Sequence, residues 1–144
     1  KGKYQLIVNK DKWKELRLKL KVITRKTTPA SFDERISRIN KLIQGWINYF
    51  KLASIQAKLK KLDEWLRNRL RYCIWHHWKK PDRKRKNLIR LGIHPDQAYA
   101  WSRTRMGGWR VAQSPILGTT ITVKRLARRG YMSMLNYYVQ VKRH

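Results

Sequence analysis

Acidic residues are scarce in this sequence of 144 residues: eight aspartates and glutamates stand against 36 lysines and arginines, which gives a formal net charge of +28. This excess is far beyond what solubility requires, so it indicates a polyanionic partner, of which nucleic acid is the first candidate. The charge is spread evenly, with +9 over residues 1–50, +10 over 51–100 and +9 over 101–144. No single segment is therefore a charged tail.

Cysteine and long apolar runs are also missing. The single cysteine, Cys73, excludes an internal disulfide and fits a reducing compartment. No apolar run approaches the roughly 18 residues of a membrane span, and no signal-peptide pattern opens the chain. We therefore expect a soluble protein inside the cell, with no membrane partner.

The motifs of common active sites are absent. The chain has no Gly-x-x-x-x-Gly-Lys loop, no paired aspartates for two catalytic metals and no supported Ser-His-Asp or Cys-His arrangement. Asp63 and Glu64 diverge on a helix, so we expect them to pair with surface cations such as Lys60. Zinc-site spacing is not matched by the cysteine and the nearby histidines, Cys73, His76, His77 and His94. We expect no catalytic residue, no metal and no cofactor.

Apolar residues at helical spacing dominate what is present. The hydrophobic fraction of 42% and seven tryptophans argue against disorder. Ser31 and Glu34 have the spacing of a capping box, which predicts where the first of two long helices begins. Its apolar stripe consists of Phe32, Ile36, Ile39, Ile43, Trp46, Ile47 and Phe50. The second long helix follows the turn at Ala53 and Ser54, and its stripe consists of Ile55, Leu59, Leu62, Leu66, Leu70, Cys73 and His77.

Shorter elements flank this pair. An alternating run from Tyr4 to Val8 indicates a possible short strand. It precedes a helix with Trp13, Leu16, Leu20 and Ile23 on one face, which either Asn9 or Asp11 could cap. The sequence therefore predicts an all-α fold in which a bundle of long helices is followed by a smaller subdomain of short helices.

The apolar periodic runs are long before Lys79-Lys80-Pro81 and short after it. We therefore place the boundary between residues 1–80 and 81–144 there. Asp82 is expected to cap a short basic helix that Gly92 ends. Further breaks are expected at Pro95, at Gly107-Gly108 and at Gly118, and a last short helix contains Tyr131, Leu135 and Tyr138. The β-branched run 119–123 does not by itself indicate a helix or a strand.

Lysine and arginine are distributed unequally. Residues 1–61 hold 13 lysines and 4 arginines, whereas residues 62–144 hold 6 lysines and 13 arginines. Arginine forks onto phosphates and base edges, so closer contact with nucleic acid is expected in the second half. Lys60, Arg67 and Arg71 are expected to form one exposed line on the third helix. The full set of candidate nucleic-acid-binding residues is Lys58, Lys60, Lys61, Arg67, Arg69, Arg71, Arg83, Lys84, Arg85, Lys86, Arg90, Arg103, Arg105, Trp109 and Arg110.

Trp75 and Trp78 share a helix face with Arg67 and Arg71 rather than with the apolar stripe. The favoured interpretation is that the C-terminal third folds over both rings, because tryptophan is usually mostly buried. The alternative is that the rings stack on unpaired bases while the arginines hold phosphates.

Several segments resemble the maturase-specific domain of group II intron-encoded reverse transcriptases. These are Arg-Ile-Ser-Arg-Ile-Asn-Lys-Leu-Ile-Gln-Gly-Trp-Ile-Asn-Tyr-Phe at 35–50 and Leu-Asp-Glu-Trp-Leu-Arg-Asn-Arg-Leu-Arg at 62–71. Further matches to the segment that follows this domain are Trp75 to Trp78, the basic helix ending in Arg90-Leu91-Gly92, and Gly108-Trp109-Arg110 with Ala112 and Ser114. The resemblance covers nearly the whole chain.

The resemblance implies that residues 1–80 form the thumb, or domain X, and that residues 81–144 form a basic DNA-binding segment. The partners it implies are group II intron RNA, a DNA target or template-primer duplex, and the remainder of a parent polymerase. Neither the paired aspartates of the polymerase palm nor a Cys-rich His-Asn-His nuclease module is found in this sequence. We therefore expect a binding role in RNA splicing and intron mobility, in the bacterial cytoplasm near the nucleoid or in an organelle.

Two other functions remain open from the sequence. A small metal-dependent nuclease would require His76 and His77 for nicking in the presence of a divalent metal. A ribosomal-type protein that packs RNA would show no preference between folded intron RNA and random RNA.

Overall fold

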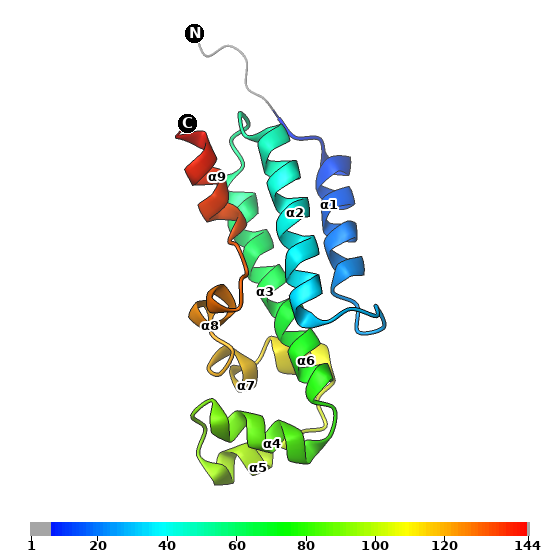
Figure 1. The fold of residues 1–144 in the computed structure, drawn as a ribbon, viewed down its shortest axis with the longest axis vertical. Helices are drawn as coiled ribbons and strands as arrows, with labels where there is room; N and C mark the ends of the chain where they lie inside the picture. Colours follow the sequence, from blue (N-terminus) through cyan, green and yellow to red (C-terminus); the bar gives the residue numbers. More distant parts are fainter. Residues whose placement is uncertain (1–6, 144) are drawn as a thin grey trace.

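Three long helices, α1 (Lys10–Ile23), α2 (Phe32–Phe50) and α3 (Gln56–Trp78), run side by side in alternating directions (Figure 1). The computed structural model describes residues 7–143. All three helices follow the predicted apolar stripes, and the turn between α2 and α3 contains Ala53 and Ser54 as expected. The predicted all-α fold is thus confirmed.

Side-chain caps fix where these helices begin. The Asn9 side chain accepts a hydrogen bond from the Asp11 backbone N–H at 2.8 Å, so Asn9 is the cap of α1. At α2 the Ser31 hydroxyl accepts from the Glu34 N–H at 3.1 Å, while the Glu34 carboxylate accepts from the Ser31 N–H at 3.4 Å. Both halves of the predicted capping box are present.

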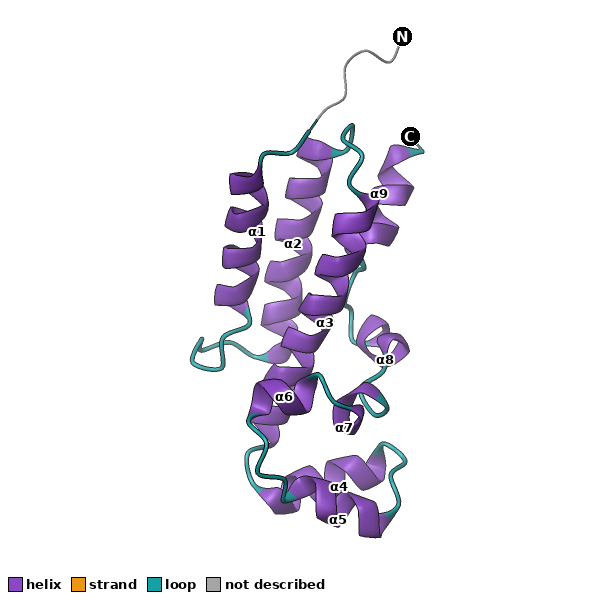
Figure 2. Cartoon of the chain, turned by 180° about the vertical axis from the view of Figure 1, so that it is seen from behind, coloured by secondary structure: helices purple, strands orange, loops and turns teal. Residues whose placement is uncertain are grey.

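Five short helices follow α3, and the first two form a hairpin at the end of the molecule opposite the start of α1 and the end of α9 (Figure 2). The next one, α6, packs on α3. In chain order the five helices are α4 (Pro81–Arg90), α5 (Pro95–Ser102), α6 (Gly108–Ala112), α7 (Pro115–Gly118) and α8 (Val123–Arg128).

Two expectations for the start of these short helices, a cap at Asp82 and a turn at Gly107-Gly108, were wrong in detail. Lys80, not Asp82, is the cap residue of α4, because Pro81 has the fixed φ of a first helical residue and Asp82 then falls in the first turn. Gly107 caps α6, and Gly108 is its first residue rather than part of a free turn. A Cβ atom at Gly108 would lie 3.0 Å from the Tyr72 ring, so the close approach of α6 to α3 requires glycine there.

The other breaks lie where the sequence predicted them. Gly92 follows α4 with φ +102°, a left-handed conformation that favours glycine. Pro95 opens α5. The run 119–123 is no strand: it spans the end of α7 and the start of α8, where the Thr122 side chain accepts from the Arg125 N–H at 3.2 Å.

The last helix, α9 (Met134–Lys142), returns to the bundle and packs against both α2 and α3. Tyr131 precedes this helix instead of belonging to it, which corrects the expected helix start. The C-terminus therefore lies at the same end of the molecule as the start of α1 (Figure 1). The division into residues 1–80 and 81–144 stays a prediction, with α9 contributing to the core around the long helices.

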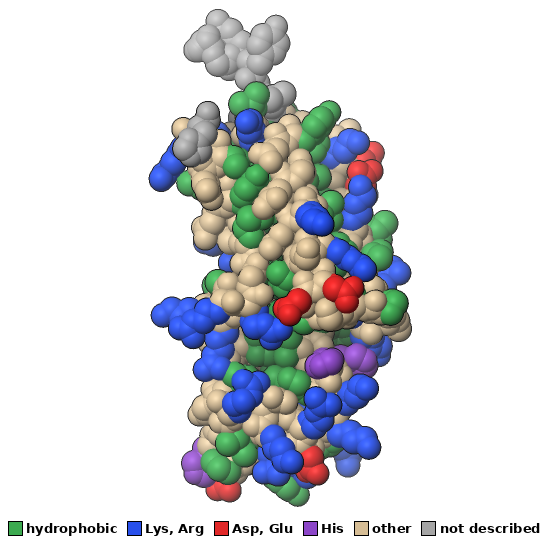
Figure 3. Space-filling model, viewed as in Figure 1, with side chains coloured by type: hydrophobic (Ala, Val, Ile, Leu, Met, Phe, Trp, Pro, Cys, Tyr) green, Lys and Arg blue, Asp and Glu red, His purple; other side chains and the backbone are tan. Residues whose placement is uncertain are grey.

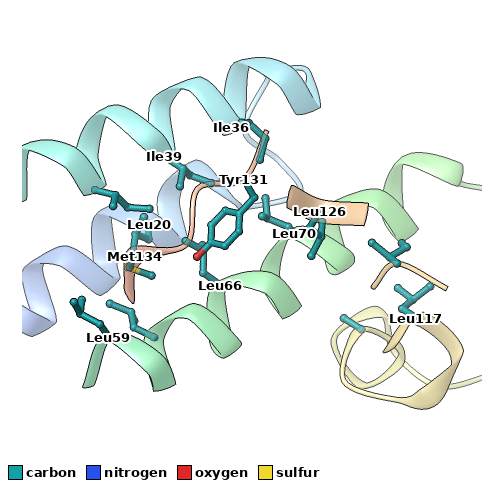
Figure 4. Packing of buried hydrophobic residues seen from close by; sticks show 14 of the residues in the cluster. Leu20, Ile36, Ile39, Leu59, Leu66, Leu70, Leu117, Leu126, Tyr131 and Met134 are labelled. Carbon is teal, nitrogen blue, oxygen red and sulfur yellow. The ribbon is translucent and has the colours of Figure 1, made fainter. Parts of the chain in front are cut away.

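One connected core runs through the described residues (Figure 4). The Tyr131 ring inserts between Ile36 and Ile39 of α2 and Leu66 and Leu70 of α3. Further along, Leu117 and Leu126 extend the same core to α7 and α8. His77, which the periodicity placed on the apolar stripe, is exposed, because the end of α3 extends past the bundle.

The N-terminal strand-like run falls mostly on residues 4–6, outside the described residues, and its remaining residues, 7 and 8, are not in a strand. Val8 is buried against the bundle. Within residues 7–143, no helix is both long and apolar enough to cross a membrane.

Candidate nucleic-acid interface

Lys58, Lys60 and Lys61 are exposed near the start of α3, as predicted. Lys58 and Lys61 face α1 across a shallow hollow of about 370 Å³ whose rim also includes Lys10, Lys14 and Arg17. The floor of this hollow contains Trp13 and Leu62. Five cations and no carboxylate line it, so the hollow has a positive potential that a phosphate backbone would neutralise.

Aromatic rings hold two of these cations in place. The Lys58 ammonium lies 5.4 Å from the centre of the Trp13 ring. The Arg17 guanidinium lies 4.5 Å from the centre of the Trp65 ring. Cation–π contacts of this kind order a long side chain without neutralising its charge, so both groups remain available to an anion.

The basic helix α4 presents a second set of candidates. Arg83, Lys86 and Arg90 are exposed, while Lys84 and Arg85 are partly buried. The Lys84 ammonium lies 4.4 Å from the centre of the Trp75 ring, and burial lowers its pKa. Lysine and arginine side chains are prominent over this end of the molecule (Figure 3).

The candidate residues around Gly107 and Gly108 are only partly exposed to solvent. Arg105 and Arg110 are exposed. Arg103 lies 3.8 Å from the centre of the Tyr99 ring and forms an ion pair of 3.6 Å with Asp82.

Trp109, another of the candidate nucleic-acid-binding residues, is partly buried. It packs edge-on against Tyr72 with ring centres 6.1 Å apart. The Arg69 guanidinium lies 5.4 Å from its ring centre on the same side. Most of this ring therefore contributes to the packing of α6 on α3 rather than to a free surface.

The predicted exposed line of Lys60, Arg67 and Arg71 is wrong at Arg71, which is buried. Its Nε donates to the Ile121 carbonyl at 2.7 Å and one terminal nitrogen donates to Asn68 Oδ1 at 2.8 Å. Burial, and secondarily the neighbouring Arg67, lowers the pKa of Arg71. The segment between α7 and α8 covers this part of α3, which the helical period of α3 alone could not show.

Arg69 is buried as well, and together with Arg35 it binds the carbonyl end of α1. Arg69 donates from Nε to Thr24 Oγ1 at 3.0 Å and from Nη2 to the Thr24 carbonyl at 3.0 Å. Arg35 donates to the carbonyls of Ile23, Arg25 and Thr28 at 2.7 to 2.8 Å. A helix C-terminus carries unpaired carbonyls and partial negative charge, so it stabilises both guanidinium groups.

Of the three candidate arginines on α3, Arg67 is the one that stays partly accessible. Its guanidinium lies 5.7 Å from the centre of the Tyr131 ring. Within the described part of the chain its Nε has no hydrogen-bond partner. This nitrogen is itself buried, so it is not open to a phosphate in this conformation.

Trp75 and Trp78 are both buried, at 4% and 6% exposure, which confirms the interpretation that later residues cover them. Their ring centres lie 6.0 Å apart. Neither ring is available to stack on a base in this conformation.

The cysteine and histidines near the end of α3 do not converge. Cys73 is buried and its Sγ donates to the Thr24 carbonyl at 3.2 Å, and burial raises the pKa of its thiol. His76 and His77 are exposed. Between residues 7 and 143, no three histidine, cysteine, aspartate or glutamate side chains are grouped so as to hold a metal ion.

Asp63 is the most consequential residue whose environment the sequence misjudged. It is 2% exposed and does not pair with a surface lysine. Its carboxylate accepts hydrogen bonds from the Tyr131 and Ser133 hydroxyls and from the backbone N–H groups of Met134 and Leu135. Burial and then the Asp63 charge raise the pKa of Tyr131 well above its ordinary value. Asp63 thus fastens the start of α9 to α3.

The sequence also missed three cations that line a hollow beside α8: Arg125, Arg128 and Arg129. Arg128 and Arg129 are adjacent and Arg125 lies three positions before Arg128, in a stretch without acidic residues, and that basic run was the available signal.

The matching family model is that of the group II intron, maturase-specific domain, and it covers residues 13–92. A comparison with curated proteins found no match. The matched residues run from Trp13 in α1 to the end of α4 and include the lining of the lysine-lined hollow except Lys10, and the matched domain is a non-catalytic one. More than half of the chain is matched, so the chain belongs to the group II intron maturase-specific domain family and has a maturase role in intron splicing.

Proposed function

We propose that this chain binds group II intron RNA, and target DNA or a template-primer duplex, through its exposed basic surface. In this role it acts beside the remainder of a parent polymerase and promotes intron mobility as well as splicing. Its site of action is then the bacterial cytoplasm near the nucleoid, or an organelle.

The observation that carries the proposal is the excess of unneutralised cations on a well-packed helical scaffold. In the described residues, four lysines or arginines pair with carboxylates: Lys19, Arg38, Arg103 and Arg129. The cations of the α1–α3 hollow and the exposed ones of α4 have no such partner in that part of the chain. When such cations neutralise phosphates, the counterions condensed on the nucleic acid are released into solution, and this release increases the affinity.

The two basic regions differ in how they would contact the ligand. Lysines dominate the hollow between α1 and α3, and a lysine binds a phosphate as a point charge without reading sequence. Arginines dominate the later helices, with Arg105 and Arg110 exposed beside α6. Arginine can fork onto two acceptors, so this second region supports selectivity.

The experiment compares binding of intron RNA, random RNA and duplex DNA at one salt concentration. In one variant Lys58 and Lys61 become alanine, and in the other Arg105 and Arg110 do. We expect the first variant to weaken all three ligands by a similar factor and the second to reduce the preference for intron RNA. The ion pair of Glu15 and Lys19 on α1 is a matched control, since replacing both with alanine leaves the net charge unchanged.

Equal binding of intron RNA and random RNA by the unaltered protein would contradict the proposal and favour a protein that packs RNA without preference. Nicking that requires a divalent metal, His76 and His77 would instead favour a nuclease.

A further inference from the structure

A cavity of about 560 Å³ lies between the α1–α2 connection, the start of α2 and the end of α3. Its volume falls in the range of about 300 to 1,000 Å³ that is typical of small-ligand sites. Pro29, Phe32 and Ile74 supply an apolar wall. The hollow between α1 and α3 is shallow by comparison. This cavity is therefore the better place for a whole chemical group of a ligand to enter.

Positive charge surrounds this cavity. Its lining contains Lys26, Lys79, Arg35 and Arg129 but one carboxylate, Asp33. That carboxylate already pairs with Arg129 at 3.5 Å. Arg129 in turn lies 4.5 Å from the centre of the Phe32 ring, so it is held at the rim.

Arg35 adds positive charge to the cavity lining, but its terminal nitrogens already donate to backbone carbonyls. It is buried, and three backbone carbonyls accept from its terminal nitrogens. No carboxylate among the described residues pairs with it. Its charge therefore persists behind the cavity wall, where low polarity transmits its field more strongly than water would.

Lys79 has a strained backbone at the mouth of the cavity. Its φ of +60° and ψ of −81° are rare for a residue with a side chain. The Lys80 N–H donates to the Trp78 carbonyl at 2.8 Å across it, which makes a γ-turn of the strained type. Strain of this kind persists where the surrounding structure holds a residue for a purpose, and here it holds a lysine beside His76 and His77.

His76 responds to the same charges. Its pKa is lowered by partial burial and by Lys26, Lys84, Lys79 and Arg35, which lie on four different segments around it. No negative group offsets them. An anion in the cavity would reverse this effect, because it favours the protonated ring.

A second hollow of about 240 Å³ adjoins the cavity and shares Ile74, Trp78 and Arg129 with it. Arg90, Arg125 and Arg128 also line this hollow, and no acidic residue does. Figure 3 shows lysine, arginine and histidine side chains gathered on this face of the molecule. Both of the adjoining spaces are therefore lined by basic side chains.

We propose that the cavity receives a single unpaired nucleotide of the bound RNA. The base lies against Pro29, Phe32 and Ile74, its phosphate faces Lys26, Lys79 and the two histidines, and the following phosphates run along Arg125 and Arg128. This inference rests on the proposed RNA-binding function and assigns that function a specific contact.

The test uses two RNA hairpins, one fully paired and one with a single bulged nucleotide, and measures their affinities for the full chain at fixed salt. We expect roughly a tenfold preference for the bulged hairpin, the size of one base contact. In the double variant Lys26→Ala and Lys79→Gly this preference is lost. Glycine tolerates the φ of Lys79, so this variant keeps the fold.

The control variant replaces Lys10 and Lys14 with alanine in the other hollow. It is expected to weaken both hairpins by one common factor and to keep the preference. A third hairpin with an abasic bulge distinguishes the contribution of the base from that of the phosphate. It should bind with the affinity of the paired hairpin. An affinity equal to that of the bulged hairpin would overturn the proposal in favour of a phosphate-only site.

Proton linkage gives an independent readout. Because binding raises the pKa of His76, the preference for the bulge should grow as pH falls from about 8 to about 5.5, the range in which histidine titrates. The variant His76→Gln should reduce this growth, while His77 still faces the phosphate. If the unaltered protein binds both hairpins equally, the cavity site is refuted but RNA binding is not. If it binds neither hairpin, the proposed function itself is refuted.

Discussion

The arginines of the long-helix bundle and those of the short helices have different roles. In the bundle, Arg35 and Arg69 are buried and donate to the carbonyl end of α1. Beyond α3, Arg83, Arg105 and Arg110 are exposed. A count of positive charges therefore overstates the surface that can contact nucleic acid, because part of the charge stabilises the fold.

The bundle needs these cations for a physical reason. The last carbonyls of α1 lack intrahelical partners, and the connection to α2 places them inside the protein. A guanidinium satisfies several of them at once and also interacts favourably with the helix dipole. The short helices α6 to α8 have four to six residues and few such internal carbonyls.

The largest expected effect concerns Asp63, which joins the bundle to the segment before α9. Asp63→Ala removes an acceptor of four hydrogen bonds and leaves buried donors without partners, so the free energy of unfolding should fall by about 3 kcal/mol or more. Denaturant unfolding measures this loss. The neighbouring Glu64→Ala is the control: Glu64 is exposed, so the change should stay within about 0.5 kcal/mol. Equal effects of the two changes would mean that Asp63 does not hold α9.

The next effect separates structural from surface arginines. Arg35→Met should lower the free energy of unfolding by about 1–3 kcal/mol, because three backbone carbonyls lose their donor. Arg38→Met on the same helix is the control, since Arg38 is exposed and pairs weakly with Glu34 at 3.7 Å. If thermal unfolding were lowered equally in both variants, the comparison between the two kinds of arginine would fail.

The reverse pattern is expected for the surface pair Arg105 and Arg110. Changing both to alanine should leave the unfolding midpoint unchanged and reduce the magnitude of the salt-dependence slope of RNA binding by about 2, one for each phosphate contact. Anisotropy titrations at several salt concentrations measure the slope. A slope equal to that of the unaltered protein would show that these two side chains do not contact phosphates.

The smallest effects concern glycines. Gly92→Ala should cost about 1 kcal/mol, because φ at this position is +102° and alanine is strained there. Gly45→Ala lies inside α2 with open space around it and should instead stabilise the protein by about 0.5–1 kcal/mol. Thermal melts of the two variants should shift in opposite directions, and a shared direction would contradict the helix boundaries.

Local patterns were sufficient to predict the long helices. The stripes of α2 and α3 and the Ser31–Glu34 capping box depend on neighbours three or four residues apart, so they can be read without tertiary information. The same holds for Gly92 and Pro95, whose backbone preferences are intrinsic.

The errors at Arg71 and Asp63 arose where distant segments meet. Arg71 is covered by Ile121, and Asp63 is reached by residues from Tyr131 to Leu135, about 70 positions away. Helical periodicity gives the face on which a residue lies, but not which later segment covers that face. The basic cavity beside Lys79 was missed for the same reason, since its lining comes from three separate parts of the chain.

The central claim, that the exposed basic surface binds RNA, is tested most directly by the salt dependence of binding to group II intron RNA. Neutralisation of roughly six to ten phosphates predicts a slope of log affinity against log salt of about −4 to −9. Anisotropy or filter binding over a range of salt concentrations gives this slope. A slope close to zero, or no binding at low salt, would contradict the account.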